Sequence, residues 1–163
     1  MAKAVSVSFI GSGNLAWHLA PALDNAGFAV REVYSRNPRH AEALVERLYE
    51  ADVKGSLDFS TSASTIFIVA TSDDAIQEVV QEIVLPEHAV LVHTSGSQPL
   101  SVLSYAATAN LGVIYPLQTF SKDRKLDFSS VPIFVESGNV ETEKLLMAMA
   151  KAVSRDVIKI TSH

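Results

Sequence analysis

The amino-acid sequence predicts an α/β domain with a doubly wound, mostly parallel sheet and helices on both of its faces. Strand-like and helix-like segments alternate along the whole chain. Residues 65–70, TIFIVA, form a continuous apolar run, which is typical of a strand buried on both sides in the middle of a parallel sheet. A glycine-containing turn at residues 11–16 joins the first predicted strand to the first predicted helix. Together these observations predict strands and crossover helices that build one sheet covered on both sides.

Hydrophobic spacing and capping residues place the elements of the N-terminal half. Leu15, Leu19 and Leu23 form one helical stripe that stops at Gly27, a residue typical of helix ends. Asn37 and Pro38 resemble a helix cap and a first helical residue. The expected strands are residues 5–10, 29–34 and 65–70, with a weak strand near Val53, and the helices follow residues 14, 38 and 72.

The C-terminal half continues the alternation. Ser72 is expected to cap a helix with two acidic residues in its first turn and Ile76, Val79, Val80 and Ile83 on its inner face. Pro99 is expected to open a helix with Leu100, Leu103 and Ala107 inward, and Leu145, Leu146, Met149 and Val153 mark a last helix. The remaining expected strands are residues 89–92, 112–115, 133–135 and 157–160.

Length and composition limit the class of protein. With 163 residues, 48% of them hydrophobic, the chain is expected to form a single domain over residues 1–163. It has no cysteine, a net charge of −5 and no basic run, which argues against thiolate chemistry and nucleic-acid binding. No apolar run approaches the roughly 20 residues of a membrane span, and the N-terminal apolar run leads directly into the glycine turn. Together these features lead us to expect a cytoplasmic protein. The five histidines, His163 included, show no metal-ligand spacing, so we expect no metal site.

The turn Gly11-Ser12-Gly13-Asn14-Leu15-Ala16 fits the pattern GxGxxA. Gly11 permits the tight turn, Gly13 has no side chain to keep a pyrophosphate away, and Ala16 lets helix and strand pack closely. The free N–H groups of the helix start would then face the phosphates. The turn follows a predicted strand and opens a predicted helix, and that context favours dinucleotide binding over a plain tight turn.

The end of the second strand indicates which dinucleotide binds. An NAD site would place Asp or Glu there to hold the ribose 2′-hydroxyl, but this chain has Ser35, Arg36 and Asn37. An arginine fork and a hydroxyl would receive a 2′-phosphate, and Arg39 and His40 could add charge. The alternative is a solvated loop with a helix cap at Asn37. We therefore predict NADP over NAD, on condition that the arginine faces the crevice and the amides of the turn are free.

Polar groups follow two more strands at the same predicted edge. Ala70, Thr71 and Ser72 are expected to form a wall of the cofactor site. In VHTSGSQP, His93, Ser95 and Ser97 would orient or protonate a carbonyl substrate, and Gly96 would allow a close backbone approach. The alternatives are that His93 is hydrogen-bonded within the core and that Ser97 caps the following helix. His93 and Ser95 are thus the catalytic candidates.

The stretches GSGNLAWHLA, VYSRN, IVATSDDAI, VHTSGSQP and YPLQTFSK together resemble Rossmann-like proteins that carry a C-terminal domain of unknown function, DUF2520. These are distant relatives of deazaflavin-dependent NADP oxidoreductases, pyrroline-5-carboxylate reductases and 6-phosphogluconate-type dehydrogenases. The resemblance implies a second, all-helical domain, absent from this chain, which in similar dehydrogenases closes over the nicotinamide and often makes the homodimer. It also implies a site whose residues are Gly11, Ser12, Gly13, Asn14 and Leu15 for the cofactor, Ser35 and Arg36 for its 2′-phosphate, and Ser95, Gly96 and residues Tyr115 to Gln118 on the substrate side.

Three functions are consistent with these patterns. The first is an oxidoreductase domain that binds NADP(H) and transfers hydride to or from a small substrate. The second is a non-catalytic dinucleotide-binding or regulatory module, because no convincing acid–base pair is evident. The third is a nucleotide-sugar or methyl-donor enzyme, of which the methyl-donor case is disfavoured because it usually has an acid after the second strand, where this chain has Ser35 and Arg36.

Overall fold

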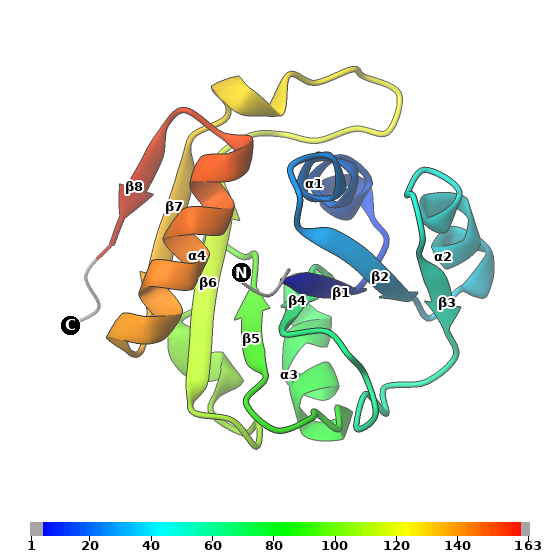
Figure 1. Ribbon diagram of the computed structural model, residues 1–163, viewed down its shortest axis with the longest axis vertical. Helices are drawn as coiled ribbons and strands as arrows, with labels where there is room; N and C mark the ends of the chain where they lie inside the picture. Colours follow the sequence, from blue (N-terminus) through cyan, green and yellow to red (C-terminus); the bar gives the residue numbers. More distant parts are fainter. Residues whose placement is uncertain (1–4, 161–163) are drawn as a thin grey trace.

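The computed structural model describes residues 5–160, which form one eight-stranded sheet with helices packed on both faces. The strand order is β3-β2-β1-β4-β5-β6-β7-β8, and all neighbours are parallel except β6 and β7. The predicted fold class is therefore confirmed (Figure 1). The elements are β1 Ser6–Ile10, α1 Asn14–Asn25, β2 Ala29–Tyr34, α2 Pro38–Val45, β3 Asp52–Lys54, β4 Ile66–Val69, α3 Asp73–Glu82, β5 Val90–His93, the 3-10 turn η1 Leu100–Leu103, β6 Asn110–Pro116, the 3-10 turn η2 Phe128–Ser130, β7 Ile133–Ser137, α4 Val140–Val153 and β8 Val157–Lys159.

Two apolar layers cover the two faces of the sheet. Buried side chains of α1, α2 and α4 belong to one apolar cluster with Val7 and Phe9 of β1, whereas those of α3 belong to a second cluster with Ile10 of the same strand. Accordingly, α1 and α3 lie on opposite sides of β1 and β4 in Figure 1. Every residue of β4 is buried, as the continuous apolar run in the sequence predicts, and every residue of the neighbouring β5 is buried as well.

The sheet reverses its direction of winding between β1 and β4. From β1 the chain proceeds outward to β2 and β3, and then returns to the other side of β1 to add β4 and β5. Ile10 lies between Tyr34 and Val69, so the turns after β1, β2 and β4 meet at one edge. This reversal is where ligands bind in open α/β sheets.

Two predictions need correction. The helix expected after Pro99 is only the turn η1, and Ala107 is exposed outside it. Ser72 occupies the N-cap position of α3, but its side chain makes no capping hydrogen bond. By contrast, Asn37 caps α2 as predicted, since its Oδ1 accepts a hydrogen bond of 3.0 Å from the Arg39 amide. No helix among residues 5–160 has the length and apolar character needed to cross a membrane.

Candidate functional site: a pocket at the reversal of the sheet

Gly11 is held between the ends of three strands. Its amide donates a 2.7 Å hydrogen bond to the Tyr34 carbonyl at the end of β2. On the other side, just after β4, the Ala70 amide donates a 2.8 Å hydrogen bond to the carbonyl of Ile10, the residue before Gly11. The φ of Gly11 is +112°, and a Cβ at this position would lie 2.5 Å from Ala70 O. Only glycine fits here, because both the backbone conformation and the neighbouring carbonyl exclude a side chain. One amide of the turn is thus already used within the protein.

Gly13 has a different environment from Gly11. It is the N-cap of α1, has a φ of −75°, and a Cβ there would meet nothing within 4 Å. The first backbone hydrogen bond of α1 runs from the Trp17 amide to Gly13 O, at 2.9 Å. The amides of Gly13, Asn14 and Leu15 precede it and have no acceptor among the described residues. The space over Gly13 is therefore an open, amide-lined cradle that a side chain would fill, which fits an anionic group.

The other residues of the turn differ in burial, from the exposed Asn14 to the buried Ser12 and Ala16. Ser12 is buried, and Ala16 is fully buried against the sheet. Ala16 thus allows the close helix–strand contact that the third position of the pattern requires. Asn14 and Leu15 form the first turn of α1.

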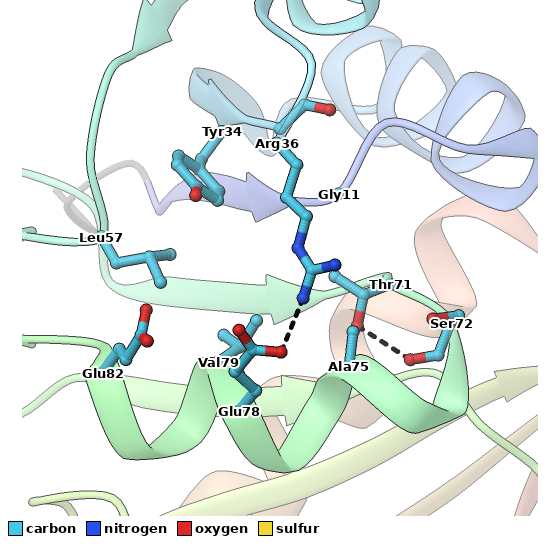
Figure 2. A pocket seen from close by; sticks show the side chains of 11 residues that line it. Gly11, Tyr34, Arg36, Leu57, Thr71, Ser72, Ala75, Glu78, Val79 and Glu82 are labelled. Carbon is cyan, nitrogen blue, oxygen red and sulfur yellow. Dashed lines mark hydrogen bonds and ion pairs between the residues drawn. The ribbon is translucent and has the colours of Figure 1, made fainter.

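A pocket of about 240 Å³ opens beside Gly11. It lies between the ends of β2 and β4 and one face of α3 (Figure 2). Its lining residues are Gly11, Tyr34, Ser35, Arg36, Leu57, Thr71, Ser72, Ala75, Glu78, Val79 and Glu82. The pocket therefore brings the predicted residues Gly11, Ser35, Arg36, Thr71 and Ser72 together.

Arg36 faces this pocket, but it is not free. Its Nη2 donates a 2.7 Å charge-assisted hydrogen bond to Oε2 of Glu78 on α3, across the opening (Figure 2). The side chains are 69% and 59% exposed, so the ion pair is in contact with water and contributes little to stability. Within residues 5–160, only one of the five N–H donors of the guanidinium has a hydrogen-bond partner.

Sequence reasoning missed the two carboxylates of the pocket, Glu78 and Glu82. The end of β2 carries no acid, as the sequence indicates, but α3 supplies both from the opposite wall. The signal was present in the chain, because Ala75, Glu78, Val79 and Glu82 have the i, i+3, i+4, i+7 spacing of one helix face.

The residues after β2 and β4 divide into two groups. Ser35, Thr71 and Ser72 line the pocket, and Thr71 Oγ1 donates to Ser72 O at 3.1 Å. Ala70 and Asn37 are not among the lining residues: Ala70 is buried beneath Gly11, and the side-chain oxygen of Asn37 caps α2.

His93 is fully buried at the end of β5, and both of its ring nitrogens are used. Nδ1 accepts a 3.0 Å hydrogen bond from the Ser95 amide, and Nε2 is 3.1 Å from Pro99 O, to which it donates. The neutral tautomer protonated at Nε2 satisfies both contacts. Burial lowers the pKa of His93 below its usual value, with the Pro99 carbonyl acting in the opposite direction. This geometry favours the alternative in which His93 holds its own loop.

Ser95, Ser97 and Asp73 form a hydrogen-bonded chain. Ser97 Oγ donates to Asp73 Oδ2 at 2.6 Å, and the Ser95 and Ser97 hydroxyls are 3.3 Å apart. Hydrogen bonds from Ser97, and then Ser95, lower the pKa of Asp73. Ser97 therefore connects its loop to the first turn of α3, and it does not make the cap after Pro99 that the alternative interpretation assigned to it.

Gly96 lies against the ring of Tyr115, which occupies the space that a Cβ would need. The close approach expected at Gly96 is thus made by a side chain of β6. Gln118 lies elsewhere: it lines a separate small cavity with His18 and Phe120, and its Oε1 accepts a hydrogen bond from the Thr119 amide at 3.0 Å. Among residues 5–160 no group of three or more metal-ligating side chains gathers, and His163 lies outside the described residues.

The fold and the pocket define a Rossmann-like domain of the type found in NAD(P)-dependent oxidoreductases. The family model described as "NADP oxidoreductase coenzyme F420-dependent" matches residues 6–96, so the chain belongs to this family. No curated protein matches the chain significantly.

Solved structures agree with the family. A Bacteroides fragilis protein assigned as an NADP oxidoreductase is 36% identical, with a TM-score of 0.84, over 96% of this chain and 61% of that protein. Synechocystis arogenate dehydrogenase (14% identity, TM-score 0.79) matches 96% of this chain and 60% of its own. An imine reductase from a Pseudomonas species (20% identity, TM-score 0.76) matches 99% and 57%. The last two share the fold, and the chain spans about three fifths of the length of each of the three proteins.

Proposed function

We propose that this chain is the NADP(H)-binding domain of an oxidoreductase that transfers hydride to or from a small polar or anionic substrate. The observation that carries the proposal is the pocket that places Arg36 and Ser35 beside Gly11, at the reversal of the sheet. The open amides over Gly13 lie on the same turn. A dinucleotide with two separated phosphate groups matches that arrangement.

Each predicted cofactor residue has a role in this proposal. The amides of Ser12, Gly13, Asn14 and Leu15 would receive the pyrophosphate, since the start of α1 offers donors and no competing side chain. Ser35 and Arg36 would hold the 2′-phosphate through a hydroxyl and a guanidinium fork. Thr71 and Ser72 would line the ribose, and Ala70 would support the turn from beneath Gly11. Asn37 would fix the start of α2 and so the loop that carries Arg36.

The substrate would bind beyond β5 and β6. When bound, the nicotinamide supplies or accepts the hydride. The Ser95 hydroxyl, whose oxygen already accepts a 3.2 Å hydrogen bond from the Ser97 amide, would orient a substrate carbonyl. Gly96, Ser97 and Tyr115 complete the proposed substrate side, whereas Gln118 lines a separate cavity and is not part of it. His93 would keep the loop in place through its two ring nitrogens.

We further propose that the chain is of the DUF2520 type within its family and works in the cytoplasm. In that type an all-helical second domain would close over the nicotinamide and make most of a homodimer interface.

The test is a calorimetric titration of NADPH, NADH and S-adenosylmethionine into the chain. We expect NADPH to bind tighter than NADH, and S-adenosylmethionine not to bind. Arg36→Ala should weaken the binding of NADPH by about tenfold and should change the binding of NADH little. Tenfold is at the lower end for the loss of a charge-assisted hydrogen bond, because Arg36 must also leave Glu78 or share its donors with it. Arg39→Ala is the matched control, since Arg39 lies one turn away and outside the pocket lining. Equal losses for both dinucleotides in Arg36→Ala would reject the assigned role.

A second candidate function, a dinucleotide-binding regulatory module without turnover, is favoured by one observation. Neither ring nitrogen of His93 is available for proton transfer. Screening the two-domain protein for substrate-dependent oxidation of NADPH distinguishes the two functions, because a regulatory module binds NADPH without consuming it.

A further inference from the structure

The charges in the pocket are not the ones that would suit a 2′-phosphate best. Its lining holds one cation, Arg36, and two carboxylates, Glu78 and Glu82. Glu78 holds the guanidinium at 2.7 Å, while Glu82 lies one helical turn further along α3, beside Leu57 and away from the guanidinium (Figure 2). A phosphate that approaches Arg36 therefore also approaches Glu78.

Either of two arrangements then carries a cost. If Arg36 leaves Glu78 for the phosphate, the protein loses its existing ion pair. If Arg36 bridges both groups with its remaining donors, the carboxylate lies close to a dianion of the same sign. NADH carries a neutral 2′-hydroxyl, so it meets neither cost.

We propose that Glu78 is a specificity-determining residue, which competes with the 2′-phosphate for Arg36 and so limits the preference for NADPH over NADH. This inference depends on the proposed function, since it assumes that the adenosine half occupies this pocket. Glu78 would act on the phosphorylated cofactor from α3, the wall of the pocket that faces the loop with Ser35 and Arg36. It would let the domain release NADP(H) more readily than Arg36 alone would allow.

The size of the effect follows from the exposure of the pair. Both side chains are more than half exposed, so water screens their interaction strongly. We expect Glu78→Gln to tighten NADPH by about three- to tenfold at low salt, and the gain to shrink at physiological ionic strength, where the Debye length is about 8 Å. Glutamine keeps the shape and a hydrogen-bond acceptor, so packing around α3 should not change.

The experiment compares Glu78→Gln with Glu82→Gln, which removes an equal charge from the same lining without touching the partner of Arg36. Dissociation constants for NADPH and NADH are measured for both variants, alone and combined with Arg36→Ala, at 20 and 200 mM salt. The expected result is a gain for NADPH in Glu78→Gln that exceeds the gain in Glu82→Gln, leaves NADH almost unchanged, and disappears when Arg36 is replaced.

Three results would overturn the inference. Equal gains in the two glutamine variants would mean that only the overall charge matters. An unchanged NADPH affinity in Glu78→Gln would mean that the ion pair does not compete. A large loss of NADH binding would make Glu78 a ligand of the 2′-hydroxyl instead. Failure of the proposed function appears differently, as an absence of NADPH preference, or of its dependence on Arg36, in the protein that retains Glu78.

Discussion

The two glycines of the first turn should respond to substitution in opposite ways. In Gly11→Ala, the new Cβ would lie 2.5 Å from Ala70 O with φ at +112°. A left-handed backbone costs on the order of 1–3 kcal/mol for a residue with a side chain, and crowding a packed core adds a similar amount. We expect a free energy of unfolding lower by about 2–5 kcal/mol. For a domain of this size that means a Tm lower by roughly 5–15 °C.

At Gly13, by contrast, φ is −75°, and the side chain of Gly13→Val enters open space. Its stability should change by less than about 1 kcal/mol, mainly through the loss of a favoured N-cap residue. Its NADPH affinity should fall by at least about tenfold, because the side chain fills the cradle that the pyrophosphate needs. Thermal melts and NADPH titrations of both variants measure the two effects. A Gly13→Val protein that binds NADPH normally, or a Gly11→Ala protein with an unchanged Tm, would refute this account of the turn.

Further predictions concern the loop after β5. Ser97→Ala should lower stability at pH 7 by less than about 1 kcal/mol, because it removes a hydrogen bond to an exposed carboxylate. Since the pKa of Asp73 is lowered in the folded protein, that contribution is present above the usual carboxyl pKa and is lost as the pH falls below it, so urea melts of the two proteins should converge in acid; a constant gap would contradict this. The pKa of His93 is also lowered in the folded protein, because burial favours the neutral ring. Below the usual histidine pKa of about 6.5 the unfolded state therefore binds more protons than the folded state, so the stability should fall as the pH drops below that value. His93→Gln should lose that part of the pH dependence, which urea melts between pH 5.5 and 7.5 would measure; an unchanged slope would show that His93 does not cause it.

Much of the fold was predictable because its signals are local. The buried run of β4 and the turn at Gly11 follow directly from residue type and order. The antiparallel pairing of β6 with β7 was also within reach. Parallel neighbours need a crossover connection, usually a helix, and the chain between Pro116 and Ile133 has no helical pattern.

Other features depend on contacts that hydrophobic spacing does not report. The segment after Pro99 was predicted as a helix, but Ser101, Val102 and Ser104 are weak helix formers and only η1 forms. The position of Glu78 opposite Arg36 depends on how α3 packs across the sheet from the end of β2. The two hydrogen bonds of His93 likewise depend on how the loop to Pro99 folds back, which residue types alone could not decide.

The central claim, that Arg36 at the end of β2 receives a phosphate on the adenosine ribose, is tested most directly by the adenosine half alone. Calorimetry would compare 2′,5′-ADP with 5′-AMP in the parent protein and in Arg36→Ala. We expect 2′,5′-ADP to bind about tenfold tighter than 5′-AMP in the parent, and the difference to vanish in the variant. Equal binding of the two nucleotides by the parent protein, or a difference that persists without Arg36, would contradict the claim.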